Sequence, residues 1–87
     1  MYEIKYDGRA ADGVKNIPQN LKEKLADAIK DRLMVDPNQY GKPLHGVLCG
    51  YRRLRVRDYR IIYRVMEADK IVRILEISNR NDVRHYD

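Results

Sequence analysis

Residues 51–66, which read YRRLRVRDYRIIYRVM, decide the fold. In the first half of this stretch apolar side chains alternate with arginines, and this period of two gives a strand one apolar and one cationic face. Asp58 follows at a turn, and from Tyr59 to Met66 the alternation resumes. The stretch therefore predicts a β-hairpin whose first strand carries Leu54 and Val56 on one face and Arg53, Arg55 and Arg57 on the other.

The hairpin continues into a third strand. Glu67-Ala68-Asp69 forms a second turn, and Ile71 to Ile77 is apolar on both faces, as expected of a strand that is covered on each side and central in its sheet. A polar tail follows from Ser78 to Asp87. Residues 51–77 therefore predict an antiparallel meander.

The first half of the chain predicts a short strand and two helices. Met1 to Tyr6 alternates apolar with charged residues, and Gly8 to Asn16 has helical spacing until Pro18 breaks the hydrogen-bond pattern. A second helix, capped by Asn20 with Glu23 three positions on, ends at Asp36-Pro37. Its apolar face consists of Leu21, Leu25, Ala28, Ile29 and Leu33. The glycines and the proline of residues 40–50 predict an irregular crossing back to the sheet.

These elements predict an α+β fold in a single domain, residues 1–87. A short N-terminal strand and a helical hairpin precede the C-terminal three-stranded meander, and the helices pack on one face of an antiparallel sheet. Eighty-seven residues are too few for two cores. No apolar run is long enough to span a membrane, and the N-terminus has no signal-peptide pattern, so we expect a cytoplasmic protein with no membrane partner. Cys49 is the only cysteine, which excludes an internal disulfide and argues against a zinc site.

Charge is concentrated in the second half of the chain. Residues 1–41 hold seven basic and seven acidic residues, whereas residues 42–87 hold eleven basic and six acidic, so the whole net charge of +5 lies in the second half. Guanidinium groups match phosphate oxygens and tyrosine rings stack on bases, so this mixture suits single-stranded RNA. The predicted RNA-binding residues are Tyr51, Arg53, Arg55 and Arg57. The alternative is a solvated face, but arginines that face one way repel each other unless an anion lies among them.

The tail adds candidates for catalysis. An arginine at position 80 is placed to stabilise charge on a phosphorane-like transition state, and His85 or Tyr86 to exchange a proton with the attacking or leaving oxygen. The alternative for the tail arginine is a pairing with Asp82 or Asp87. No acidic cluster suited to Mg²⁺ is present, so we expect neither a metal nor a cofactor.

The chain resembles the RelE/ParE toxins of type II toxin–antitoxin systems almost from end to end. Residues 42–46, KPLHG, resemble the family's K-x-L-x-G crossing, and residues 51–63 resemble its Y-x-R-x-R-x-G-D-Y-R-x-x-Y hairpin. Arg80 with Tyr86 is similar to the arginine and terminal tyrosine of the RelE branch. The resemblance implies a RelE-like fold, a cognate antitoxin partner, and cleavage of mRNA in the A site of the ribosome.

The resemblance also assigns roles within a metal-independent reaction in which the ribose 2′-OH attacks its own phosphodiester. It implies phosphate binding by Arg53 and Arg55, a place beside the scissile phosphate for Arg60, transition-state stabilisation by Arg80, and base stacking or proton transfer by Tyr86.

One departure concerns the general base. Arginine occupies position 53, where RelE has a lysine, and arginine stays protonated above roughly pH 12 and cannot accept the proton. His85 next to Tyr86 resembles the ending of the YoeB relatives and titrates near neutral pH, so we favour His85 as the base. Two other functions stay open: a ParE-like toxin that poisons DNA gyrase without RNA chemistry, and a non-toxic member that only binds nucleic acid.

Overall fold

The structure is a computed structural model that describes residues 1–79. The alternating stretch folds as predicted into a hairpin of β3 (Arg52–Val56) and β4 (Tyr59–Met66). The register pairs Leu54 with Ile61 and Arg55 with Arg60, so apolar side chains share one face and arginines the other. A 3₁₀ turn, Glu67–Asp69, leads into β5 (Ile71–Asn79), which completes the predicted meander.

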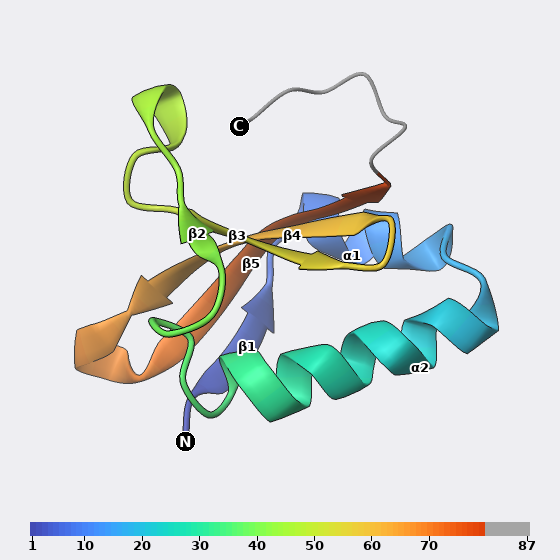
Figure 1. Cartoon of the computed structure of the whole chain (residues 1–87), viewed down its shortest axis with the longest axis horizontal. Helices are drawn as coiled ribbons and strands as arrows, with labels where there is room; N and C mark the ends of the chain where they lie inside the picture. Colours follow the sequence, from blue (N-terminus) through green and yellow to red (C-terminus); the bar gives the residue numbers. More distant parts are fainter. Residues whose placement is uncertain (80–87) are drawn as a thin grey trace.

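The meander belongs to a five-stranded sheet with the strand order β1-β5-β4-β3-β2 (Figure 1). β1 (Glu3–Tyr6) lies parallel to β5, whereas every other pair is antiparallel, so the prediction of an antiparallel sheet is confirmed for the other strands and wrong for the first one. Parallel neighbours need a connection of a dozen residues or more, and the helices and the meander together supply it. The sequence predicts that the third strand of the meander, β5, is central in the sheet. It is instead an inner strand between β1 and β4, and the middle strand is β4.

Two helices connect β1 to the rest of the sheet. α1 (Gly8–Lys15) is followed by α2 (Gln19–Ala28), whose C-terminal end continues as one π-helical turn, Ile29–Leu33. The predicted cap is wrong, because Asn20 lies inside α2 and Pro18 precedes the helix without a side-chain cap. The fixed φ of proline suits that position, where its carbonyl accepts the N–H groups of Leu21 and Lys22.

The two helices share one core with the sheet. The predicted apolar face of the second helix is confirmed, since Leu25 on α2 and Ile29 and Leu33 in the π-helical turn are buried. α1 lies so close to β5 that a β-carbon on Gly13 would stand 2.5 Å from the carbonyl oxygen of Ile77. The sheet contributes Leu54, Tyr59, Ile61, Tyr63, Val72, Ile74 and Ile77 to this core. The helices therefore cover the apolar face of the hairpin and leave the arginine side open.

The opposite face of the sheet is covered only in part. Residues 40–50, predicted as irregular, contain a two-residue strand, β2 (Lys42–Pro43), and a 3₁₀ turn, Gly46–Leu48. Pro43 is tolerated because β2 is an edge strand. After β2 the chain folds over the sheet and buries Leu44 and Leu48 against Ile62 in a second, smaller cluster. Within residues 1–79 no helix is both long and apolar enough to cross a membrane.

Candidate nucleic-acid interface

Four cations from three neighbouring strands lie on the face of the sheet opposite the helices, and we call this group the cationic face. It consists of Lys42 on β2, Arg53 and Arg55 on β3, and Arg60 on β4. The register pairs Lys42 with Arg53 and Arg55 with Arg60, and residues directly opposite each other on paired strands share a face. The structure thus brings together three of the predicted site residues and adds a lysine.

The cations differ in burial. Lys42 and Arg55 are exposed, Arg53 is half-buried, and Arg60 retains only 9% of its surface. Partial burial, and then the positive charges of Arg55 and Arg60, lower the pKa of Arg53 below its ordinary range. Arginine stays charged despite such a shift, so the cluster keeps its positive charge and favours an anion.

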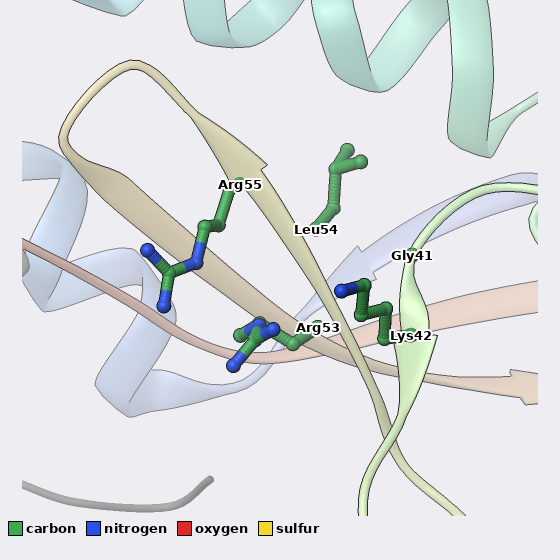
Figure 2. Close-up of a pocket in the computed structure, with 5 residues that line it drawn as sticks. All are labelled: Gly41, Lys42, Arg53, Leu54 and Arg55. Carbon is green, nitrogen blue, oxygen red and sulfur yellow. The ribbon is translucent and has the colours of Figure 1, made fainter.

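A hollow of about 530 Å³ opens beside the first residue of β2, where β3 extends beyond its pairing with β2. Its lining is formed by Gly41, Lys42, Arg53, Leu54 and Arg55 (Figure 2). Figure 2 shows the Lys42 side chain extending from β2 toward β3, while Arg53 and Arg55 project to the side away from Leu54. An extended phosphodiester backbone has the charge that this lining complements.

The loop before Lys42 is held by two side chains of the hairpin. The Tyr63 hydroxyl lies 2.8 Å from the carbonyl oxygen of Pro37 and 2.5 Å from that of Tyr40. Arg52 donates to the carbonyl oxygens of Asn38, Gly41 and Tyr40, at 3.0, 3.1 and 3.4 Å. Burial raises the pKa of Tyr63, which therefore stays a neutral donor. These two residues of the arginine-rich hairpin thus have a structural role.

The remaining predicted RNA-binding residues lie elsewhere. Tyr51 is partly buried and packs against the small cluster of Leu44, Leu48 and Ile62. Arg57 lies in the turn after β3, exposed and with a φ of 58°. The prediction that Arg57 shares the strand face with Arg53 is wrong, because β3 ends at Val56. The family's hairpin motif has a glycine at the position that Arg57 occupies here. The left-handed φ at this position explains why glycine suits it.

Sequence reasoning missed Glu76 and gave no role to Lys42. Glu76 interrupts the apolar run of β5, pairs with Ile62, and keeps only 1% of its surface exposed. Its carboxylate lies 3.6 Å from the guanidinium of Arg9 on α1. An acid within an otherwise apolar strand was the available signal, because a buried carboxylate requires a partner. For Lys42 the signal was its motif, but only the β2–β3 pairing shows which residues it faces.

The predicted catalytic residues of the tail, Arg80, His85 and Tyr86, lie outside the described residues. Arg60 is the one predicted catalytic residue that the structure describes, and it lies on the cationic face opposite Ser78. Within residues 1–79 no three His, Cys, Asp or Glu side chains gather as metal ligands would.

Comparisons with known proteins agree with this fold. The family described as "ParE toxin of type II toxin-antitoxin system, parDE" matches residues 4–84. The toxin RelE of Mycobacterium tuberculosis is 26% identical over 80 residues, which cover 92% of this chain and 82% of the relative. The toxin RelG of the same organism is 26% identical over 82 residues, 94% of each chain.

Solved structures show the same architecture. The toxin–antitoxin complex RelBE2 of Mycobacterium tuberculosis contains a chain that superposes with a TM-score of 0.85 at 26% identity, covering 93% of both chains. The isolated RelE toxin of E. coli superposes with a TM-score of 0.78 at 18% identity, covering 91% of this chain and 84% of that one. The chain therefore belongs to the RelE/ParE family and is a toxin of the type II toxin–antitoxin class.

Proposed function

We propose that this toxin is an endoribonuclease that cleaves mRNA on the ribosome by attack of a ribose 2′-OH on the adjacent phosphodiester. The observation that carries the proposal is the cationic face, where Lys42, Arg53 and Arg55 line a hollow and the more buried Arg60 lies opposite Arg55. Two relatives support it as well, because they are named toxin RelE and toxin RelG.

The roles within the reaction follow from charge and position. Arg53 and Arg55 bind the non-bridging phosphate oxygens of the backbone, while the more buried Arg60 lies beside the scissile phosphate. The tail completes the site: Arg80 stabilises charge that develops on phosphorus, Tyr86 stacks on a base or transfers a proton, and His85 accepts the 2′-OH proton. The new O2′–P bond forms as the P–O5′ bond breaks, which leaves a cyclic phosphate and a 5′-hydroxyl.

The proposed partners are the ribosome with mRNA in its A site and a cognate antitoxin, and both place the action in the cytoplasm. RelBE2 of Mycobacterium tuberculosis and archaeal RelE–RelB are complexes of a toxin with its antitoxin. An acidic or amphipathic antitoxin segment laid across the cationic face neutralises it and excludes RNA.

The test adds purified protein to ribosomes programmed with a defined mRNA and maps new 5′ ends. We expect cleavage by the wild type and losses of 100-fold or more, on the order expected when a positioned transition-state donor is removed, in Arg60→Ala and Arg80→Ala. Arg32→Ala is the matched control, since Arg32 is exposed on the helical segment away from the cationic face. Intact mRNA with the wild type, at concentrations that saturate ribosomes, would refute the proposal.

The base is tested separately within the same assay. His85→Ala should slow cleavage at least as much as Tyr86→Phe, because a lost proton acceptor affects the attack itself. Equal rates for His85→Ala and the wild type would remove histidine from that role.

A second candidate, poisoning of DNA gyrase, is favoured by the ParE description of the matching family. Inhibition of gyrase supercoiling by the wild type, with programmed mRNA left intact, would select it over the ribonuclease.

A further inference from the structure

Lys42 occupies a special place among the four cations, because it reaches the hollow from a different strand. It lies directly opposite Arg53 in the β2–β3 pairing, its side chain is exposed, and it lines the hollow with Arg53 and Arg55. Figure 2 shows its side chain extending across toward β3. A phosphate held by the two arginines is therefore within reach of a lysine on its β2 side.

Side chains of the hairpin hold the backbone that leads into Lys42 by hydrogen bonds. Tyr63 and Arg52 between them hold the carbonyl oxygens of Pro37, Asn38, Tyr40 and Gly41, the residues that lead into β2. Gly41 adopts a φ of 75° and approaches Tyr63 too closely to carry a side chain. These contacts preorganise the position of the Lys42 backbone, a property expected of groups that act on a reacting atom.

Lysine also differs from arginine in proton chemistry. When the P–O5′ bond breaks, the departing 5′ oxygen carries a developing negative charge and needs a proton. Arginine acts as a fixed charge, because its guanidinium is not deprotonated in proteins, whereas a lysine ammonium carries protons that it can give up. Among the described residues that line the hollow, Lys42 is the one with this property.

We propose that Lys42 is the general acid of the reaction: its Nζ–H donates a proton to the 5′ oxygen as the P–O5′ bond breaks. The amine is left neutral and regains a proton from solvent, while the proton of the 2′-OH is taken by a separate group. The inference rests on the proposed ribonuclease function and assigns within it a step that the arginines serve poorly.

The test changes the leaving group. The cleavage site is first mapped on ordinary mRNA, and a second mRNA is then made with sulfur in place of the bridging 5′ oxygen at that bond. A thiolate is a stable leaving group that needs no proton. Single-turnover rates on programmed ribosomes are measured for the wild type, Lys42→Met, Lys42→Arg and, as a charge-matched control, Lys24→Met on the exposed side of α2.

The expected pattern is specific to a proton donor. Lys42→Met should cleave ordinary mRNA roughly 100-fold more slowly than the wild type, the low end of the range for general acid catalysis, and the sulfur-containing mRNA at close to the wild-type rate. Lys42→Arg keeps the positive charge but should also cleave ordinary mRNA more slowly than the wild type. On the sulfur-containing mRNA its rate should return to near the wild-type rate. Lys24→Met should match the wild type on both.

Other outcomes overturn the proposal. The same loss for Lys42→Met on both mRNAs means that Lys42 acts through charge on the phosphate, and no loss on either means that it takes no part. If the wild type does not cleave ordinary mRNA at the mapping step, the proposed ribonuclease function itself fails, and the two failures are thereby distinguished.

Discussion

Tyr63 and Gly41 lie in a contact that leaves no room for a side chain on the glycine: a β-carbon there would stand 2.5 Å from the Tyr63 hydroxyl oxygen. That hydroxyl is the group that holds the carbonyl oxygens of Pro37 and Tyr40. The contact therefore joins the middle strand of the sheet to the loop that leads to Lys42. The contact gives Tyr63, the last tyrosine of the hairpin motif, a structural role.

Gly41→Ala should destabilise the protein by about 2–4 kcal/mol, because alanine pays for the left-handed backbone and also displaces the Tyr63 hydroxyl from its acceptors. Gly46→Ala is the matched control, since Gly46 has a φ of 70° with no atom within 4 Å of its missing β-carbon. We expect a loss of about 1 kcal/mol there. Urea unfolding measures both.

The Tyr63→Phe background separates the two causes. Without the phenol oxygen, the added cost of Gly41→Ala should shrink toward that of Gly46→Ala, a non-additive result typical of residues in contact. Additive losses would show that the contact with Tyr63 does not determine the cost.

Gly13→Ala should destabilise the protein, although the same change in an ordinary helix interior stabilises by roughly 0.5–1 kcal/mol. The reversal of sign follows from the Ile77 carbonyl, which would stand 2.5 Å from the new β-carbon and would force α1 away from β5. Gly8→Ala, at the start of the same helix and with no atom within 4 Å, should be neutral or slightly stabilising. Equal midpoints of unfolding for the two variants would contradict the close packing of α1 on β5.

Arg57→Gly should stabilise the protein by about 1 kcal/mol, because glycine adopts the φ of 58° without the cost that a β-carbon brings. Arg57→Ala removes the same charge but keeps the β-carbon, so it should give no comparable gain. Thermal melting of the two variants decides the cause. A gain from alanine as large as that from glycine would mean that charge repulsion, and not backbone conformation, is relieved.

Glu67 makes stability depend on acid pH. Tyr2 donates to its carboxylate at 2.7 and 2.8 Å, and Lys70 and Asn38 bind it at 3.0 and 2.8 Å. The bond from Tyr2, then those from Lys70 and Asn38, lower the pKa of Glu67 from 4.5 to about 2. A depressed pKa in the folded state adds stability that is present above the unfolded pKa and is lost as the pH falls toward the folded one.

Melting temperatures of the wild type and Glu67→Gln should therefore differ above about pH 5 and converge as the pH falls from 4.5 to about 2. Glu23→Gln, on the exposed side of α2, should follow the wild type throughout. A gap between wild type and Glu67→Gln that persists unchanged at pH 2 would exclude the titration of Glu67 as its cause.

The sequence by itself determined the elements whose signal is local. A period of two in residues 51–66 placed Leu54 and Ile61 on the core side and Arg53 and Arg55 on the other, because the pleat of a strand sends successive side chains to opposite faces whatever surrounds it. Helical spacing likewise identified the buried side of the second helical segment, where Leu25 of α2 and Leu33 of the π-helical turn lie.

Only the tertiary structure decided which of these elements meet. Three of these contacts join residues that are distant in the chain: β1 lies parallel to β5, Lys42 pairs with Arg53, and Glu76 is buried beside Arg9. Such contacts follow from how the whole chain buries its apolar surface and satisfies its polar groups, which no local period encodes. For the same reason Arg57, two residues after Arg55, does not lie on the cationic face. The hydrogen bonds of the whole hairpin determine that the strand ends at Val56.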